Sequence, residues 1–136
     1  MSSLEYIFIS NDPFQIECAD ECSIEYIMID LETIGKKERQ KNFDTLISNH
    51  TINDIYSVRN IIKKSNLLVR CNPIHSDSKT EIDNIISAGA DSIMLPMFTN
   101  TKQVESFLNI VNDRVPTILL FETPQACLRI DSIIAL

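Results

Sequence analysis

Glu122 is the residue whose type and position point most directly to chemistry. It closes the run Pro116-Thr-Ile-Leu-Leu-Phe-Glu-Thr-Pro-Gln-Ala126, in which an apolar segment typical of a strand ends in a carboxylate just before a helix start. The carboxyl ends of parallel strands face the ligand crevice of open α/β sheets and form the active face of barrels, so this carboxylate is placed to bind a metal ion or a substrate. It could instead assist the cap of a helix that begins at Thr123-Pro124.

Polar residues also follow the other apolar runs of the chain. They are Asp30 and Glu32 after the second run, Arg70 and Asn72 at the third, and Pro96 after the fourth. Functional residues contributed by several successive strand ends are typical of the active face of a barrel. A guanidinium at such a position can hold a carboxylate through two parallel hydrogen bonds, although Arg70 could equally form a salt bridge with one of the strand-end acids.

The runs themselves have the length and composition of strands. Their interiors are continuous apolar stretches rich in β-branched residues, which is typical of parallel strands covered on both faces. We expect side chains such as Ile27, Ile29 and Val69 to face the interior of the barrel. The expected strands are Tyr6–Ser10, Glu25–Asp30, Leu67–Cys71, Ser92–Leu95 and Thr117–Phe121.

Helical patterns lie between these strands. Apolar residues recur at helical spacing from Ile52 to Ile62 and from Val104 to Val111, and a last helix is expected from Thr123-Pro124 to the end of the chain. Ser78-x-x-Glu81 is interpreted as a capping box, with Gly89 ending the helix that it begins. The chain therefore contains five successive βα units in one domain, residues 1–136.

Length alone would suit an open flavodoxin-like sheet, because a closed (β/α)8 barrel needs about 250 residues. The loop Ser10-Asn-Asp-Pro-Phe14, however, has no glycine-rich phosphate-binding sequence. The strand-end residues favour a parallel (β/α)8 TIM-type barrel of which this chain contains about five units. We expect the strands in the order 1-2-3-4-5.

Composition excludes several classes of protein. The net charge of −7, with scattered Lys and Arg, argues against nucleic-acid binding. No apolar run reaches the ~20 residues needed to span a bilayer, and Met1–Asn11 does not have the pattern of a signal peptide, so we expect no membrane contact and a cytoplasmic location. The four cysteines form no Cys-x-x-Cys pair and are expected to be buried thiols, with Cys18 and Cys22 sharing a helix face.

Four ordered segments carry a family resemblance: Asp30-Leu-Glu32, Leu68-Val-Arg-Cys-Asn-Pro73, Ala88-Gly-Ala-Asp-Ser-Ile-Met-Leu-Pro96 and Leu120-Phe-Glu-Thr-Pro-Gln-Ala126. In order and spacing the chain, from about Ile24 onward, resembles the HpcH/HpaI aldolase and citrate lyase β-subunit superfamily. The resemblance implies a divalent-metal-dependent barrel enzyme, a carbon–carbon lyase or aldolase, that acts on a 2-oxo acid or an acyl-CoA thioester through an enolate.

The resemblance also implies residue roles. Glu122 matches a metal carboxylate, for Mg²⁺ or Mn²⁺, and Arg70 matches the arginine that binds the substrate and faces the enolate. Pro96 is expected at the substrate, and Asp30 and Glu32 as outer, water-mediated partners of the metal. Lys36 or Arg39 could bind an anionic substrate tail, although a solvated run of charges is the plainer interpretation.

Two departures from the family pattern stand out. Thr33 occupies the position where the 2-oxo acid aldolases carry a histidine base, which leaves His50 and His75 as substitutes, although a single surface histidine usually has no catalytic role. The second metal carboxylate of the family lies on a strand beyond Leu136. We therefore expect this chain to be the first part of a longer barrel, inactive alone and part of a homo-oligomer. The alternatives are a non-catalytic α/β assembly or binding protein and a flavodoxin-like regulatory domain.

Overall fold

The computed structural model describes residues 4–36 and 48–136. Within them, five parallel strands form one sheet in the order β1-β2-β3-β4-β5. The sequence prediction of strand order is confirmed, and the 2-1-3-4-5 order of a flavodoxin-like sheet is ruled out. The strands are β1 (Ile7–Ile9), β2 (Tyr26–Asp30), β3 (Asn66–Arg70), β4 (Ser92–Leu95) and β5 (Thr117–Leu119).

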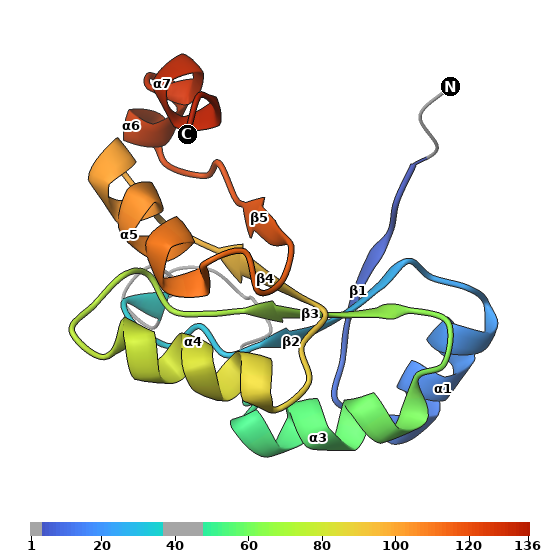
Figure 1. Cartoon of the computed structure of the whole chain (residues 1–136). Coiled ribbons are helices and arrows are strands. Elements are labelled where there is room, and N and C mark those ends of the chain that lie inside the picture. Colours follow the sequence, from blue (N-terminus) through green and yellow to red (C-terminus); the bar gives the residue numbers. More distant parts are fainter. Residues whose placement is uncertain (1–3, 37–47) are drawn as a thin grey trace.

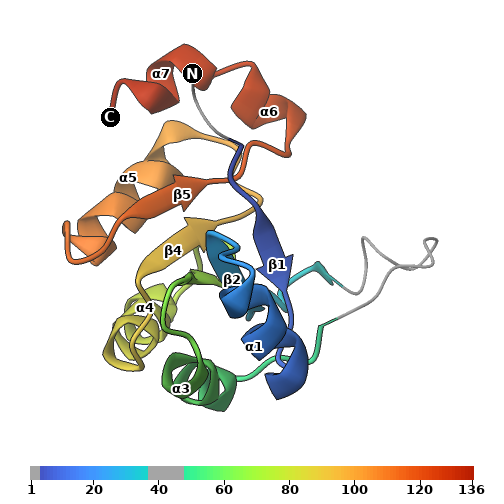
Figure 2. The same ribbon diagram turned by 90° about the vertical axis from the view of Figure 1, so that its right-hand side faces the viewer.

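The helices of the βα units pack on one side of this sheet (Figures 1 and 2). The first four are α1 (Pro13–Glu21), α3 (Ile52–Ile61), α4 (Ser78–Ser87) and α5 (Thr101–Val111). Strands joined by helices on a single side are the arrangement of a barrel wall, so the chain has a partial (β/α) barrel fold. None of the helices in the described ranges is long and apolar enough to cross a membrane.

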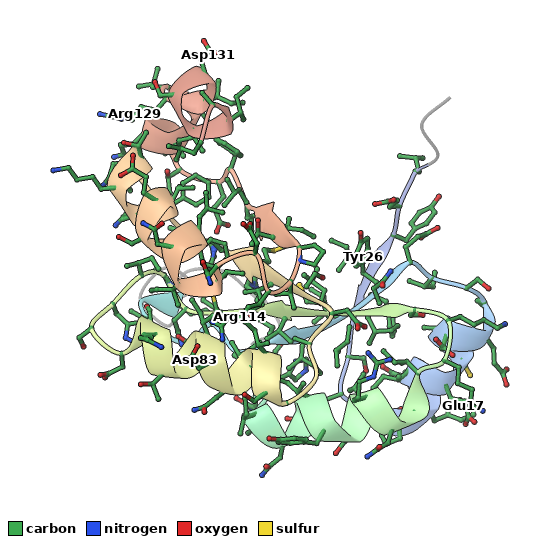
Figure 3. All side chains as sticks on the ribbon, in the orientation of Figure 1. Glu17, Tyr26, Asp83, Arg114, Arg129 and Asp131 are labelled. Carbon is green, nitrogen blue, oxygen red and sulfur yellow. The ribbon has the colours of Figure 1, made fainter. Side chains whose placement is uncertain are left out.

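Side chains that alternate along each strand divide the sheet into two faces. Ile27, Ile29 and Val69 are fully buried in the core between sheet and helices, so the expectation that they face the barrel interior was wrong. The opposite, inner face carries Met28, Leu68 and Met94, with Tyr26, Ile118 and Leu120 packed around them. Figure 3 shows Tyr26 on the side of the sheet away from α3. Because Asp30 and Arg70 lie two residues beyond Met28 and Leu68, they project from this inner face.

Side-chain caps mark the starts of α1 and α5, whereas the cap predicted for α4 is not formed. The Asp12 and Asn100 carboxylate and amide oxygens accept the backbone N–H groups of Gln15 and Gln103 at the starts of α1 and α5. The expected capping box of Ser78 and Glu81 is absent: Asp77 is the N-cap of α4, with no side-chain cap hydrogen bond. Glu81 instead binds groups on the loop that follows β3.

The last expected helix is two short ones, α6 (Pro124–Cys127) and α7 (Ile130–Ile134). The start is as predicted, because Thr123 Oγ1 accepts the N–H of Ala126 and Pro124 follows it. The break after Cys127 lets Ala126 and Ile133 both be buried, whereas Leu128 between them is 85% exposed.

The cysteines differ from the prediction as well. Cys71 is buried, but Cys18, Cys22 and Cys127 are exposed, and all four are free thiols. Helix α1 buries Ile16 and Asp20, so the face that carries Cys18 turns away from the core.

Candidate functional site

Asp30 and Arg70 form the centre of the candidate site. They are register partners at the carboxyl ends of the neighbouring strands β2 and β3. Arg70 donates to Asp30 twice, from Nε to Oδ1 at 2.9 Å and from Nη2 to Oδ2 at 2.8 Å. The Asp30 side chain is only 2% exposed and that of Arg70 17%. This two-bond geometry fixes the plane of the guanidinium at the mouth of the inner face.

Lys36 reaches the same carboxylate from the segment after β2. Its Nζ pairs with Asp30 Oδ2, and its side chain is only 6% exposed. The interpretation of Lys36 as one of a run of solvated charges was therefore wrong. Arg39, the other cation considered for a substrate tail, lies outside the described residues.

The charges of this cluster stabilise one another. Burial raises the pKa of the Asp30 carboxyl, but hydrogen bonds from Arg70 and Lys36 outweigh burial and hold that pKa below its ordinary value. The hydrogen bonds to Asp30 in turn raise the pKa of Arg70, with smaller contributions from the charges of Glu32 and Glu122. Asp30 is therefore ionised and Arg70 cationic at neutral pH.

Glu32 completes the acidic pair after β2. It is buried, its backbone N–H donates to Asp30 Oδ1 at 3.2 Å, and its Oε2 lies 3.6 Å from Arg70 Nε. Both predicted strand-end acids thus contact Arg70. The alternative interpretation of Arg70, a salt bridge with these acids, describes its observed contacts.

His50 lies closer to this cluster than the sequence suggested. Its Nδ1 accepts the backbone N–H of Asp30 at 3.0 Å, and burial lowers its pKa, so the ring is neutral with its proton on Nε2. No periodicity or spacing in the sequence places residue 50 beside residue 30, because the contact depends on how the chain returns to the sheet.

A second network joins the loops after β2 and β3. Asn72 Oδ1 accepts the backbone N–H groups of Thr33 at 2.8 Å and Ile34 at 2.9 Å. The Asn72 backbone N–H and Nδ2 both donate to Glu81 Oε1, and Glu81 Oε2 binds His75 Nε2 at 2.9 Å. His75 therefore lies on the outer side of this network, whereas His50 lies beside Asp30.

Glu122 lies on the loop between β5 and α6, beyond the fifth strand as predicted, and is exposed. Its Oε1 accepts the backbone N–H of Met97 at 3.1 Å, which links the loops after β4 and β5. Met97 has a φ of 54°, a conformation that costs energy for a residue with a side chain and that often marks functional loops. Pro96, directly before it, is buried, and the rings of Phe98 and Phe121 pack edge to face at 5.1 Å.

The described residues do not by themselves form a metal site. Within residues 4–36 and 48–136 there is no group of three His, Cys, Asp or Glu side chains that could hold a metal ion. Both Asp30 oxygens accept hydrogen bonds from Arg70, and Oδ2 also pairs with Lys36. Mg²⁺ is usually bound by one or two protein carboxylates and keeps several water ligands, so an ion at this place would depend on water or on groups outside the described residues.

Comparison of the fold with solved structures gives a consistent class. The chain is similar to the crystal structure of citrate synthase SbnG, with a TM-score of 0.67 and 15% sequence identity over 95% of this chain. A structure of the same enzyme with a glutamate-to-glutamine substitution gives a TM-score of 0.63, again at 15% identity and over 95% of the chain. The chain spans 56% and 53% of the lengths of these two neighbours.

At this identity the likeness establishes the fold alone, which is that of part of a TIM-type barrel. The fold implied by the sequence motifs is thereby confirmed. No protein-family model matches the chain, and no curated protein matches it in sequence.

Proposed function

We propose that this chain forms part of a carbon–carbon lyase or aldolase that binds a 2-oxo acid or an acyl-CoA thioester through Arg70. The observation that carries the proposal is the Asp30–Arg70 pair, in which a buried carboxylate fixes a partly exposed guanidinium at the carboxyl end of a barrel wall. Ligands of barrel enzymes bind at this end.

Arg70 would bind and orient the substrate. Asp30 engages the Nε and Nη2 side of the guanidinium, so in this proposal the Nη1 side meets a substrate carboxylate or the oxygen that gains charge as an enolate forms. An arginine suits this role because its charge persists and its donors lie in one plane. Buried Pro96 would contribute apolar contact to the substrate.

A divalent cation, Mg²⁺ or Mn²⁺, belongs to the proposal. When bound, such an ion polarises a carbonyl oxygen. Glu122 would supply one ligand, Asp30 and Glu32 would act at most through water, and the remaining carboxylates would come from polypeptide outside the described residues. A reducing, cytoplasmic location and a homo-oligomeric state are also proposed, the former supported by three exposed free thiols.

The deciding experiment is the Arg70→Lys substitution. Lysine keeps the charge but loses the two-bond fork, so we expect pyruvate affinity to fall about tenfold or more, equivalent to roughly 1.4 kcal/mol. Calorimetric titration of the folded protein measures this effect. Arg114→Lys is the control, because Arg114 pairs with Asp83 on the helix-covered side of the molecule (Figure 3).

The second candidate is a non-catalytic assembly or binding protein. It is favoured by the fact that the contacts seen for Arg70 and Lys36 are internal ion pairs with Asp30, as in a purely structural cluster. The same titration separates the two: equal pyruvate affinity in the wild type and in Arg70→Lys, or no binding in either, supports the non-catalytic protein.

A further inference from the structure

We propose that Asn72 is a positioning residue, which acts on Arg70 through the segment Thr33–Lys36. This inference rests on the proposed function, because it concerns the same site. Asn72 follows β3, and its side chain crosses to the loop after β2. It has no contact with Arg70 among the hydrogen bonds described, so its effect must pass through other residues.

The Asn72 side chain holds the start of this segment. Its Oδ1 accepts the backbone N–H groups of Thr33 and Ile34 at 2.8 and 2.9 Å. Two neighbouring N–H groups directed at one oxygen fix the local direction of the backbone. The segment then turns, with Lys36 N–H donating to Thr33 O at 3.3 Å and Gly35 at a φ of 72°.

The other end of the segment is held by Asp30. Lys36 returns to the buried carboxylate that fixes the plane of Arg70. The turn is thus anchored at Asn72 and at Asp30. If the anchor at Asn72 were lost, Lys36 would be less constrained, and the Asp30 carboxylate would lose one of the contacts that fix its orientation beside Arg70.

The orientation of the Asn72 amide is determined by its neighbours. The amide nitrogen donates to Glu81 Oε1 at 2.9 Å. If the amide were flipped, its NH₂ group would face the N–H groups of Thr33 and Ile34, and its oxygen would face the Glu81 carboxylate, so both interactions would be repulsive. Glu81 is held in turn by His75 Nε2. Since His75 Nδ1 accepts a hydrogen bond from the Asp77 N–H at 3.2 Å, the ring proton is on Nε2, which donates a hydrogen bond to Glu81.

This polarity allows a reversal test with three variants. Asn72→Asp opposes a carboxylate to Glu81, and Glu81→Gln alone leaves two amides facing each other. The double variant Asn72→Asp with Glu81→Gln restores a donor facing an acceptor between the two side chains with polarity reversed, but it loses the hydrogen bond that the backbone N–H of residue 72 donates to Glu81 Oε1. It also keeps an oxygen toward Thr33 and Ile34. Asp83→Asn is the control, because Asp83 lies on the same helix but pairs with Lys79 and Arg114 instead of Asn72.

Two readouts are measured on the same samples: hydrogen exchange at the amides of residues 33 and 34, and pyruvate affinity by calorimetry. In Asn72→Asp we expect exchange to accelerate and pyruvate affinity to fall, each about tenfold, while the double variant recovers part of both losses. Thermal melts ensure that every variant is compared while folded.

Unchanged exchange in Asn72→Asp overturns the proposal. So does faster exchange with unchanged pyruvate affinity, because Asn72 would then have only a structural role. If wild-type protein binds no pyruvate, the proposed function is wrong, and so is the claim that Asn72 affects substrate binding. The exchange measurements still decide whether Asn72 holds the turn.

Discussion

At the scale of single residues, the site is a cluster of paired positive and negative side chains. Two acids, Asp30 and Glu32, and two bases, Lys36 and Arg70, lie within one cluster that is largely removed from water. Burying paired charges contributes little net stability, because the cost of desolvation offsets their attraction. The cluster is therefore better explained by the orientation that it gives to Arg70 than by any gain in folding free energy.

The proposed metal role of Glu122 gives a prediction at the same scale. In a complete barrel, Glu122→Gln removes one anionic oxygen ligand, and we expect Mn²⁺ affinity to fall about tenfold or more with little change in fold. The amide oxygen can still accept the Met97 N–H, and the side chain is exposed. Electron paramagnetic resonance measures bound Mn²⁺. Metal-dependent turnover at the wild-type level in this variant would exclude Glu122 as a ligand.

Asp20 gives a pH-dependent prediction. Its carboxylate accepts the backbone N–H groups of Lys63, Lys64 and Ser65 at 2.9, 2.9 and 2.7 Å. Burial raises its pKa, but these hydrogen bonds, first that from Ser65, lower it from 3.8 to about 2. A depressed folded-state pKa stabilises the fold above the unfolded-state pKa, and this stability is lost as pH falls from about 5 towards 2.

Asp20→Asn should therefore lower the free energy of unfolding by about 2 kcal/mol at pH 7, and the gap to wild type should shrink towards pH 3. Urea unfolding at several pH values and one protein concentration measures the gap. Glu17→Gln, an exposed carboxylate on the same helix (Figure 3), controls for loss of charge. A gap at pH 3 as large as that at pH 7 would contradict the assignment.

At the scale of elements, each helix is fixed to its strands by a few specific positions. After α4 the chain turns at Gly89, which has a φ of 104°, and a Cβ there would lie 3.2 Å from Arg59 Cδ. Arg59 itself pairs with Asp91 at 2.6 Å, so the end of α4 is in contact with α3. The short connection from α4 to β4 depends on a backbone conformation that glycine adopts readily.

Gly89→Ala should destabilise the fold by about 1–3 kcal/mol, mainly through backbone strain, because the Arg59 side chain can move aside. Thermal or urea unfolding measures the loss. The comparison of Gly89→Ala in the Arg59→Ala background separates the two causes: we expect nearly the same penalty there, and a penalty that disappears would show that the steric contact dominates.

At the scale of the whole molecule, the described sheet has two edges, and its inner face is covered only in part: Met28, Leu68 and Met94 are buried there, whereas apolar side chains of β1 are exposed. On β1, Ile7 and Ile9 are 44% and 46% exposed, although a barrel would bury them. The outer edges of β1 and β5 pair with no other described strand. Unpaired strand edges next to apolar side chains promote association. This chain spans about half the length of its structural neighbours, and their remaining polypeptide is available to cover such edges and apolar side chains.

Residues 1–136 made alone should therefore self-associate and have no lyase activity. A few hundred Å² of uncovered apolar surface, at about 25 cal/mol per Å², is comparable with the ~5–15 kcal/mol stability of a whole domain. Sedimentation velocity, with a thermal melt, tests this. A cooperative monomer at micromolar concentration would show that the chain closes its own core. Replacing Ile7 and Ile9 by Thr should shift the distribution towards monomer if the exposed edge drives association.

The sequence by itself determined the order and type of the elements. Apolar runs of strand length, helical spacing from Ile52 to Ile62 and the Thr123-Pro124 helix start are local signals, and local signals follow from covalent geometry and side-chain sterics. The strand-end positions of Asp30, Arg70 and Glu122 were found for the same reason, because a residue at the end of a strand remains there in any parallel fold.

Tertiary structure alone decided which residues meet. The alternation of side chains along a strand places Met28 and Leu68 on one face of the sheet and Ile27 and Val69 on the other. Only packing against the helices decides which of these two faces is the inner one. Likewise Glu81 binds Asn72 and His75 instead of capping its helix, and Lys36 is buried on Asp30 instead of being solvated. Buried polar groups must find partners wherever the fold supplies them, and those partners are distant in sequence.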